Sequence, residues 1–255
     1  MSKQTYEVAL MFLGIDVGGT FTDAVLANEG KIVNQAKVLT TGENILQGIL
    51  KALDSVLIEQ PPCSIDRVVI SSTVVTNALV IGDTDEVLLA VMPGTGMDIS
   101  HSFPVKPLVI EGYIDHRGRI TQPMRVGHEE LEGELQSKVI AAVSGKFSVR
   151  NQQNEVALKK EIAELGISKI FLGSEMSGEL NFVRRTNSAY FSAAVFRKYQ
   201  EFIDKIKESI TSRGMTAPVH ILKADGGTLP LSIALKHPVE AIFTGPAASV
   251  LGIEA

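Results

Sequence analysis

The stretch GIDVGGTFTDAVLA, residues 14–27, places two adjacent glycines between two runs of strand-forming residues. Residues 12–17 and 20–27 are both apolar and rich in β-branched side chains, which predicts two strands joined by a tight turn at the glycines. An Asn-Glu-Gly turn then leads into a third predicted strand over residues 31–38. We therefore expect a three-stranded meander here, and not a strand followed by a helix.

The glycine turn predicts a phosphate-binding hairpin. Gly18 and Gly19 carry no side chains, so a bound group can approach the backbone N–H donors of the turn. Thr20 and Thr22 are separated by one residue, which predicts that both hydroxyls lie on one face and point toward the turn. Asp16 lies two residues before the glycines, where we expect its carboxylate to hold a hydrated Mg²⁺.

A plain hairpin is the alternative interpretation, because a Gly-Gly turn often does no more than join two strands. No Lys-Ser or Lys-Thr follows the glycines and no helix is predicted there, which excludes a P-loop. The absence of a third glycine also excludes the dinucleotide-binding fingerprint. Asp23 follows the threonines and, by alternation, faces away from them, so we rank it as a weaker candidate for ligand contact.

Length and composition limit the class of protein. The chain has 255 residues, of which 45% are hydrophobic, enough for one large core or two smaller ones. It contains no apolar run of the roughly twenty residues that a membrane helix needs, and residues 1–10 lack signal-peptide features and are expected to be a leader or ragged start. A single cysteine excludes a disulfide framework. The net charge of −5 argues against nucleic acid as a partner. We expect a cytoplasmic protein that binds neither membrane nor nucleic acid.

The remaining chain alternates between predicted strands and helices. Further strands are expected over residues 67–71, 86–91, 169–172 and 218–223, with weak strands near 109–114. Helices are expected over residues 43–58, 72–80, 128–144, 155–165 and 182–212. Near the start of the last helix, Arg184-Arg185 is expected to be a solvated face, with binding of a substrate carboxylate as the lesser alternative. This alternation predicts an α/β fold with a mixed sheet.

Five stretches resemble one family. GIDVGGTFTDAVL (14–26) is similar to the first phosphate motif of the sugar-kinase, heat-shock-70 and actin superfamily, in the form carried by the hydantoinase and 5-oxoprolinase (hydantoinase A) family. SSTVVTNALV (71–80) resembles that family's GTT-x-x-TNAL segment, and EGYIDHRGRI (111–120) its ERID-x-x-G segment. Residues 222–252 resemble its SDGG…SGPAAGV stretch, and RRTNSAYFSA (184–193) is a looser match to a family helix.

The chain also departs from the family pattern. Ser71-Ser72 replaces Gly-Thr, and Ala224 replaces a Ser. Residues 140–180 match poorly, and we expect them to lack the apolar strand and the NPxHE-like stretch of the family. The second Asp-Gly-Gly-Thr motif, which in the family follows the GPAA helix, does not occur in this sequence.

The resemblance implies an actin-like (ribonuclease-H-like) ATPase lobe with a mixed five-stranded sheet and an inserted subdomain. Residues 11–93 would form the first part of the lobe with the phosphate hairpin, and residues 94–185 an inserted or irregular region. Residues 186–255 would complete the lobe and end in the helix that connects it to a second lobe.

Two further groups of site residues follow from the resemblance. Asp225, Gly226 and Gly227 come directly after a predicted strand. Asp-Gly is a common turn dipeptide, but the carboxyl end of a strand is where α/β sheets bind ligands. We therefore expect Asp225 to be catalytic, as Asp16 is, and the two glycines to contact the cofactor.

Thr73, Thr76 and Asn77 lie at the start of a predicted helix. From residue types alone this is an ordinary helix cap. The unpaired N–H groups of a helix start also attract anions, and the resemblance places these three side chains on the substrate side of the cleft. Both interpretations stay open at this point.

The activity implied by the resemblance is an ATP-dependent cyclic-amide hydrolase with ATP and Mg²⁺ as cofactors. It would open a hydantoin or 5-oxoproline ring through a phosphorylated amide, with a possible second hydantoinase-type subunit. A non-catalytic nucleotide-switched activator and a small-molecule kinase of the same superfamily are the alternatives. Because only one phosphate hairpin is present, we expect residues 1–255 alone to be inactive. The lobe face that would meet a second lobe is expected to be partly apolar, so we also expect self-association as a homo-oligomer.

Overall fold

A computed structural model describes the chain over residues 10–40, 45–58, 61–135 and 138–248. These residues form two compact units. The first unit holds residues 10–81, 198–236 and 240–248. The second unit holds the described residues of 82–197 together with 237–239. It therefore extends on both sides beyond the inserted region 94–185 that we predicted. Of the predicted leader over residues 1–10, residues 1–9 lie outside the described residues.

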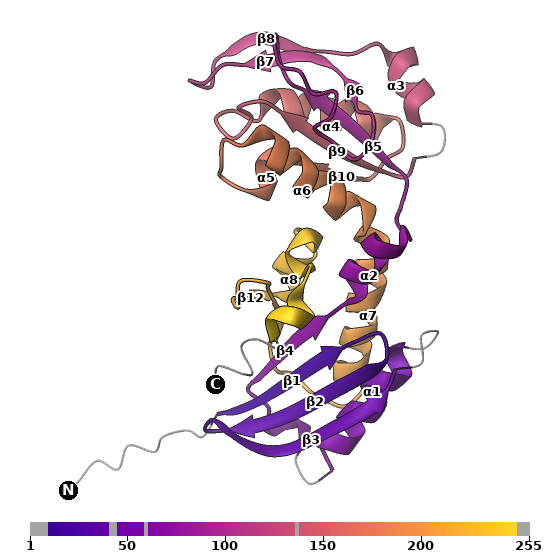
Figure 1. Cartoon of the computed structure of the whole chain (residues 1–255), viewed down its shortest axis with the longest axis vertical. Helices are drawn as coiled ribbons and strands as arrows, with labels where there is room; N and C mark the ends of the chain where they lie inside the picture. Colours follow the sequence, from indigo (N-terminus) through magenta and orange to yellow (C-terminus); the bar gives the residue numbers. More distant parts are fainter. Residues whose placement is uncertain (1–9, 41–44, 59–60, 136–137, 249–255) are drawn as a thin grey trace, which may run out of the picture. The chain divides into compact units, whose positions relative to one another are not determined.

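The first unit is built on the predicted meander. Strands β1, β2 and β3 are antiparallel neighbours, which confirms the hairpin and the second turn; they span Met11–Val17, Phe21–Asn28 and Lys31–Leu39. β4 (Arg67–Ser72) lies parallel to β1, and β11 (Val219–Leu222) lies parallel to β4. β12 (Thr228–Pro230) returns antiparallel to β11, so the sheet has the order β12-β11-β4-β1-β2-β3 and six strands instead of the expected five (Figure 1).

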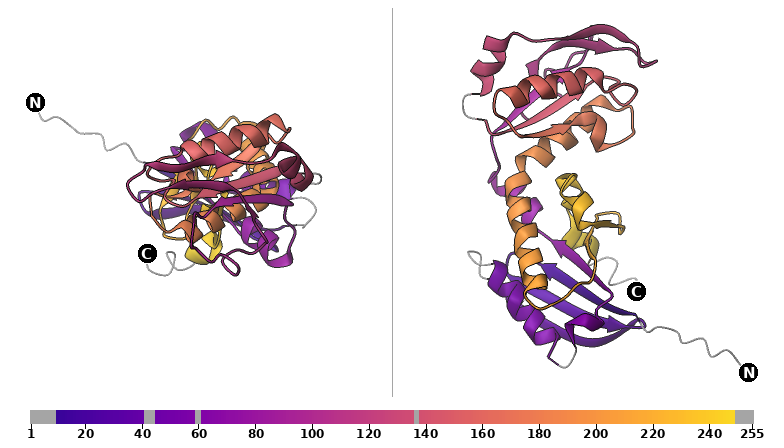
Figure 2. Two further views of the ribbon diagram at one scale, coloured as in Figure 1. Left: turned by 90° about the horizontal axis from the view of Figure 1, so that it is seen from above. Right: turned by 180° about the vertical axis from the view of Figure 1, so that it is seen from behind.

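One face of this sheet is covered by two helices. Alternate residues of β1, among them Leu13 and Ile15, are fully or nearly fully buried on this face. Helix α1 (Ile45–Val56) packs on β2 and β3. Helix α7 (Phe196–Thr211) lies beside it (Figure 2), and the Arg213 guanidinium that follows α7 donates from Nε to Asp54 Oδ1 of α1 at 2.8 Å. The opposite face of β1, β2 and β4 is the one that carries the candidate site.

The second unit contains a fully parallel sheet with helices on both faces. Its strands follow the order β10-β9-β5-β6 and span Lys169–Leu172, Ile140–Gly145, Val87–Met92 and Leu108–Val109. Helix α4 (Gln153–Glu164) packs on one face and α6 (Phe182–Ala194) on the other. Every residue of β5 and β9 is buried, as expected for strands covered on both sides. A two-stranded ribbon, β7 (Glu111–Ile114) with β8 (Ile120–Arg125), completes this unit together with α3 (His128–Leu135) and α5 (Gly173–Met176).

The helix predicted over residues 128–144 is wrong in its second half. α3 ends at Leu135, and Ile140–Gly145 is the central strand β9. A short apolar run such as Ile-Ala-Ala-Val fits a buried strand as well as a buried helix, so periodicity does not separate the two. The same strand corrects the expectation that residues 140–180 lack an apolar strand run.

Two other helix predictions change in their bounds. The helix predicted over residues 182–212 is interrupted at Val195, where φ is −104° and ψ is 0°, and becomes α6 and α7. The helix expected to begin near Ser72 is α2, Val74–Ile81. Three short elements follow the remaining turns: η1 (Pro62–Ser64), α8 (Leu231–Ala234) and η2 (Pro238–Ala241). Residues 244–248 are helical, and the rest of the predicted inter-lobe helix lies outside the described residues.

None of the helices in the described part of the chain combines the length and apolar character needed to cross a bilayer.

Candidate functional site

Asp16 lies on the sheet face that α1 and α7 leave uncovered. It is in register with Ser71 of β4 on one side and with Asp23 of β2 on the other, so the three side chains share one face. Ser71 Oγ donates a hydrogen bond to Asp16 Oδ1 at 2.5 Å, which fixes the orientation of the carboxylate. The three residues line a hollow of about 240 Å³, whose other walls come from β2, β4, β11 and Ala248.

The two threonines of the hairpin do not share that face. Thr22 is fully buried, and its hydroxyl is hydrogen-bonded to the Thr40 hydroxyl at 2.8 Å on the side of the sheet that α1 covers. The expectation that Thr22 faces a ligand is therefore wrong: its hydroxyl belongs to the packing of the meander. Thr20 lies in the turn itself, outside β2, and is exposed.

Asp23 is closer to the site than alternation alone suggested. It faces away from Thr22, as expected, but this places it directly across from Asp16. Two carboxylates in cross-strand register repel each other. The Lys37 ammonium, 3.0 Å from Asp23 Oδ1, offsets this repulsion.

Close packing of the backbone, and not a positive φ, explains the need for glycine in this turn. Both glycines have φ outside the left-handed region. Gly18 N donates to Phe21 O at 2.9 Å, and a Cβ on Gly18 would lie 2.9 Å from the same carbonyl oxygen. A Cβ on Gly19 would lie 3.5 Å from Asn77 Nδ2, which is an ordinary contact. The structure therefore requires glycine at position 18 and leaves room at position 19.

This difference gives a paired test of the hairpin. Gly18→Ala is expected to lose about 1–3 kcal/mol of stability, because the new methyl group meets a backbone oxygen that cannot yield without opening the turn. Gly19→Ala is expected to change the melting temperature little but to weaken Mg·ATP binding, since its methyl group covers the turn amides. Thermal unfolding and calorimetric titration of both variants measure the two effects. Unchanged affinity in Gly19→Ala would favour the plain-hairpin interpretation.

The start of α2 lies against the hairpin. Thr73 N donates to Val17 O at 3.2 Å, directly before the glycines. Asn77 Nδ2 donates to Thr73 Oγ1 at 3.2 Å and lies beside Gly19. The structure thus brings the predicted substrate residues Thr73 and Asn77 together with the predicted phosphate turn.

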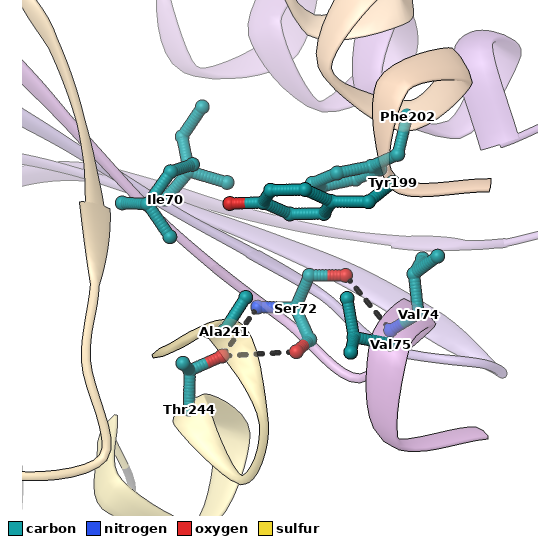
Figure 3. A pocket seen from close by; sticks show the side chains of 9 residues that line it. Ile70, Ser72, Val74, Val75, Tyr199, Phe202, Ala241 and Thr244 are labelled. Carbon is teal, nitrogen blue, oxygen red and sulfur yellow. Dashed lines mark hydrogen bonds between the residues drawn. The ribbon is translucent and has the colours of Figure 1, made fainter. Parts of the chain in front are cut away.

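Phe243 and Thr244 are hydrogen-bonded to the end of β4 and the start of α2. Thr244 Oγ1 accepts from Ser72 N at 3.1 Å and donates to Ser72 O at 2.9 Å (Figure 3). Ser72 Oγ in turn donates to Val17 O at 3.2 Å. Phe243 N donates to Thr76 Oγ1 at 3.0 Å. The stretches that contain Ser72 and Thr244 both resemble family motifs. The sequence did not indicate that they pair, because the two residues are 172 positions apart.

A small enclosed space lies behind these contacts. Ile70 and Ser72 line it together with Tyr199 and Phe202 of α7, and the Tyr199 phenol extends across it toward Ile70 (Figure 3). Its volume of about 10 Å³ leaves room for no more than one water molecule. Burial raises the pKa of the Tyr199 phenol, so this tyrosine stays neutral. The space is part of the core, and the candidate site lies on the other face of the sheet.

Asp225 stands at the same edge of the sheet, because β1, β4 and β11 run parallel and end together. β4 lies between β11 and β1, so Asp225 and Asp16 do not come from neighbouring strands. Asp225 Oδ2 lies 2.6 Å from Lys223 Nζ, and Oδ1 accepts from Gly227 N at 2.9 Å. The hydrogen bond from Lys223 holds the pKa of the exposed Asp225 carboxyl below its usual value, which makes it a poor general base.

The acidic residues of the first unit fit a magnesium ion that keeps most of its water ligands better than one coordinated mainly by protein side chains. The described residues contain no group of three or more His, Cys, Asp or Glu side chains that could hold a metal. Mg²⁺ usually keeps several waters and takes only one or two carboxylates together with substrate phosphates. Asp16, with Asp23 opposite it, offers oxygen donors of that kind.

The second unit contains a buried polar centre that the sequence did not indicate. Arg184 is exposed and pairs with Glu179 at 3.0 Å, as a solvated face predicts. Arg185 is only 1% exposed, so for this residue the prediction is wrong. Its Nη2 donates to Gly145 O at 3.1 Å and its Nη1 to Glu179 O at 2.6 Å.

Glu155 binds the backbone N–H of the same residue, Gly145. It is fully buried and accepts from Gly145 N at 2.8 Å and from Ser174 N at 3.1 Å. Burial raises the pKa of Glu155 and lowers the pKa of Arg185. Together the two charged side chains fix the loops that follow β9 and β10.

Family models match most of the chain. Residues 12–166 match the hydantoinase/oxoprolinase N-terminal region, and residues 185–255 match hydantoinase/oxoprolinase. The caprolactamase alpha subunit of Pseudomonas jessenii is 27% identical over 98% of this chain and 40% of its own length. The acetophenone carboxylase gamma subunit of Aromatoleum aromaticum is 24% identical over 99% of this chain and 40% of its own.

Solved structures agree with the fold. Nucleotide-free acetone carboxylase superposes with a TM-score of 0.81 at 19% identity, over 96% of this chain and 40% of its own. The ATP-dependent caprolactamase of Pseudomonas jessenii superposes with a TM-score of 0.73 at 23% identity, over 93% and 39%. The mixed α/β, actin-like ATPase fold predicted from the sequence is confirmed. The chain spans about two fifths of the length of these relatives.

Proposed function

Because the chain belongs to the hydantoinase/oxoprolinase family, we propose that it supplies the phosphate-binding part of an ATP-dependent enzyme that opens a cyclic amide such as a hydantoin or 5-oxoproline. One observation carries the proposal. The glycine turn, the Asp16 carboxylate held by Ser71 and the start of α2 meet where β1 and β4 end. A glycine turn without side chains, an oriented carboxylate and a helix start is a setting suited to a nucleoside triphosphate.

The chemistry explains why ATP is needed. A lactam carbonyl is a poor electrophile, and transfer of the γ-phosphoryl group to its oxygen breaks the bond to ADP and forms an O–P bond. Water then attacks the ring carbon and the C–N bond opens, which leaves an acyl phosphate. A second water hydrolyses the acyl phosphate to a carboxylate and inorganic phosphate. Bound Mg²⁺ would neutralise charge on the phosphates.

The residues of this chain take distinct parts in that reaction. Gly18 N is already hydrogen-bonded to Phe21 O, so the Gly19 amide is the one that would donate to a phosphate oxygen. Asp16, held in place by Ser71, would bind the hydrated ion. Thr73 and Asn77 stand next to the turn on the substrate side. Asp225 is kept ionised by Lys223 and contributes fixed negative charge; it does not accept a proton.

The relatives support ATP use and favour a second candidate reaction. Caprolactamase and acetone carboxylase are both ATP-dependent. Two of the similar proteins are carboxylases, which favours ketone carboxylation as the second candidate function for the same phosphate site. Two relatives are subunits of larger enzymes, which supports a partner subunit.

The complete enzyme, purified with its partner chains, tests the proposal. Phosphate release from Mg·ATP is expected to rise with hydantoin, 5-oxoproline or ε-caprolactam and to be matched by ring-opened product. Residues 1–255 alone are expected to bind Mg·ATP weakly and to release no phosphate, because most nucleotide contacts in a two-lobed ATPase require both lobes. Stimulation only by a ketone with bicarbonate would favour the carboxylase. Stimulation by neither substrate class would overturn the proposal.

A further inference from the structure

Phe243 combines two features that core packing does not explain. Its φ is +60°, in the left-handed region that aromatic residues rarely adopt. It also leaves 59% of its surface exposed. A single exposed aromatic residue is ordinary on a protein surface. It is unusual for a strained backbone to hold such a residue in solvent. Backbone strain of this kind is concentrated at functional positions.

Three contacts hold the backbone of Phe243 in this conformation. Its own N–H donates to Thr76 Oγ1 at 3.0 Å. The next residue, Thr244, is hydrogen-bonded through its hydroxyl to both backbone groups of Ser72. Gly245 packs so closely on Thr73 that an added Cβ would lie 3.1 Å from Thr73 Cγ2. Phe243 is therefore fixed beside the residues assigned to the substrate side.

Two consecutive residues of α2 there supply a hydrogen-bond donor and an acceptor. Within the described part of the chain, the Thr76 hydroxyl is engaged as an acceptor from Phe243 N, which leaves its proton free to donate. Asn77 uses Nδ2 toward Thr73, and in the same described residues its Oδ1 carries no hydrogen bond. Ring closure holds the C=O and N–H of a lactam on one edge. A hydroxyl donor and an amide oxygen are the two groups that such an edge requires.

We propose that Phe243 determines substrate specificity by packing its ring on the methylene face of a lactam whose amide edge is held by Thr76 and Asn77. The inference rests on the proposed function and narrows its substrate class. A hydantoin carries a second carbonyl and a second N–H on its ring. Placing these polar groups against a phenyl ring without partners is unfavourable, so lactams with a continuous apolar face are the better substrates.

Phe243→Gly is the informative variant, because glycine adopts positive φ without strain. The melting temperature is expected to stay the same or rise, whereas the KM for ε-caprolactam in the complete enzyme is expected to rise roughly tenfold or more at unchanged kcat. The KM for hydantoin should change less. Phe12→Ala, which removes an exposed aromatic residue elsewhere on the sheet, serves as the matched control and should leave both KM values unchanged.

A spectroscopic variant gives an independent measurement. The chain contains no tryptophan, so Phe243→Trp places a single indole at this position. Its fluorescence is expected to shift as ε-caprolactam is added, and that of Phe12→Trp is expected to stay constant. An unchanged KM in Phe243→Gly, or a loss of stability there, overturns the inference. If wild-type enzyme binds Mg·ATP and responds to lactams, only the role of Phe243 has failed; if it does neither, the proposed function has failed with it.

Discussion

Asp16→Asn is expected to lower ATP hydrolysis by the complete enzyme roughly a hundredfold or more while the fold stays intact. Asparagine keeps an Oδ1 that accepts the hydrogen bond from Ser71 Oγ, so the structural contact of 2.5 Å is preserved. What is lost is the negative charge that would hold the hydrated Mg²⁺. The variant therefore separates a metal role from a structural one.

Asp23→Asn is the matched control, because it removes the carboxylate directly across the strand pair. Its ion pair with Lys37 is exposed and contributes little to stability, and activity is expected to fall less than about tenfold. Steady-state phosphate release and Mg²⁺-dependent nucleotide binding measure both variants. Near-normal turnover in Asp16→Asn would leave Asp16 a structural residue. A greater loss in Asp23→Asn would transfer the metal role to that side chain.

The sequence predicted the meander well because its signals are local. Two turns with Gly and a regular alternation of apolar residues define β1, β2 and β3 within about thirty residues. The structure also brings the motif residues near the glycines together, since Thr73 and Asn77 contact the hairpin. In each case the interacting segments carry recognisable patterns of their own.

The alternation of side chains along β2 could not predict which face of the strand would be buried. It placed Thr22 and Asp23 on opposite faces, and the structure agrees. It could not say which face α1 would cover, because that depends on Gly48 of α1 approaching Thr22. The hydroxyl that looked like a ligand group is packed in the core, and the carboxylate that looked remote faces Asp16.

Ser71 shows what a departure from a family pattern can mean. The family has Gly-Thr where this chain has Ser71-Ser72. Ser71 orients Asp16, and Ser72 joins Val17 to Thr244. These contacts join segments that are far apart in the sequence, so nothing near position 71 could have indicated them.

The second unit was harder to predict because its stabilising contacts are not local. β9 is a short apolar run without alternation, since helices cover both faces of its sheet. Arg184 and Arg185 are adjacent and chemically identical in the sequence. Only the positions of the Gly145 and Glu179 carbonyls decide which of the two is buried.

Arg185→Met is expected to destabilise the second unit by about 3 kcal/mol or more. Methionine fills much of the space but leaves the carbonyls of Gly145 and Glu179 without their donors. It also removes the positive charge near the buried Glu155. Urea unfolding followed by circular dichroism gives the loss of stability, and hydrogen exchange of the β9 and β10 amides shows whether it is confined to this unit.

Arg184→Met is the control that makes this result specific, because it changes the same residue type one position earlier. Arg184 is 69% exposed, and its loss is expected to cost less than about 0.5 kcal/mol. Adding Glu155→Gln to Arg185→Met should cost less than the sum of the two single changes, since each charge is costly when left alone in the interior. Equal stabilities for the two arginine variants would mean that Arg185 is only a space-filling side chain. Additive losses in the double variant would mean that the two buried charges do not interact.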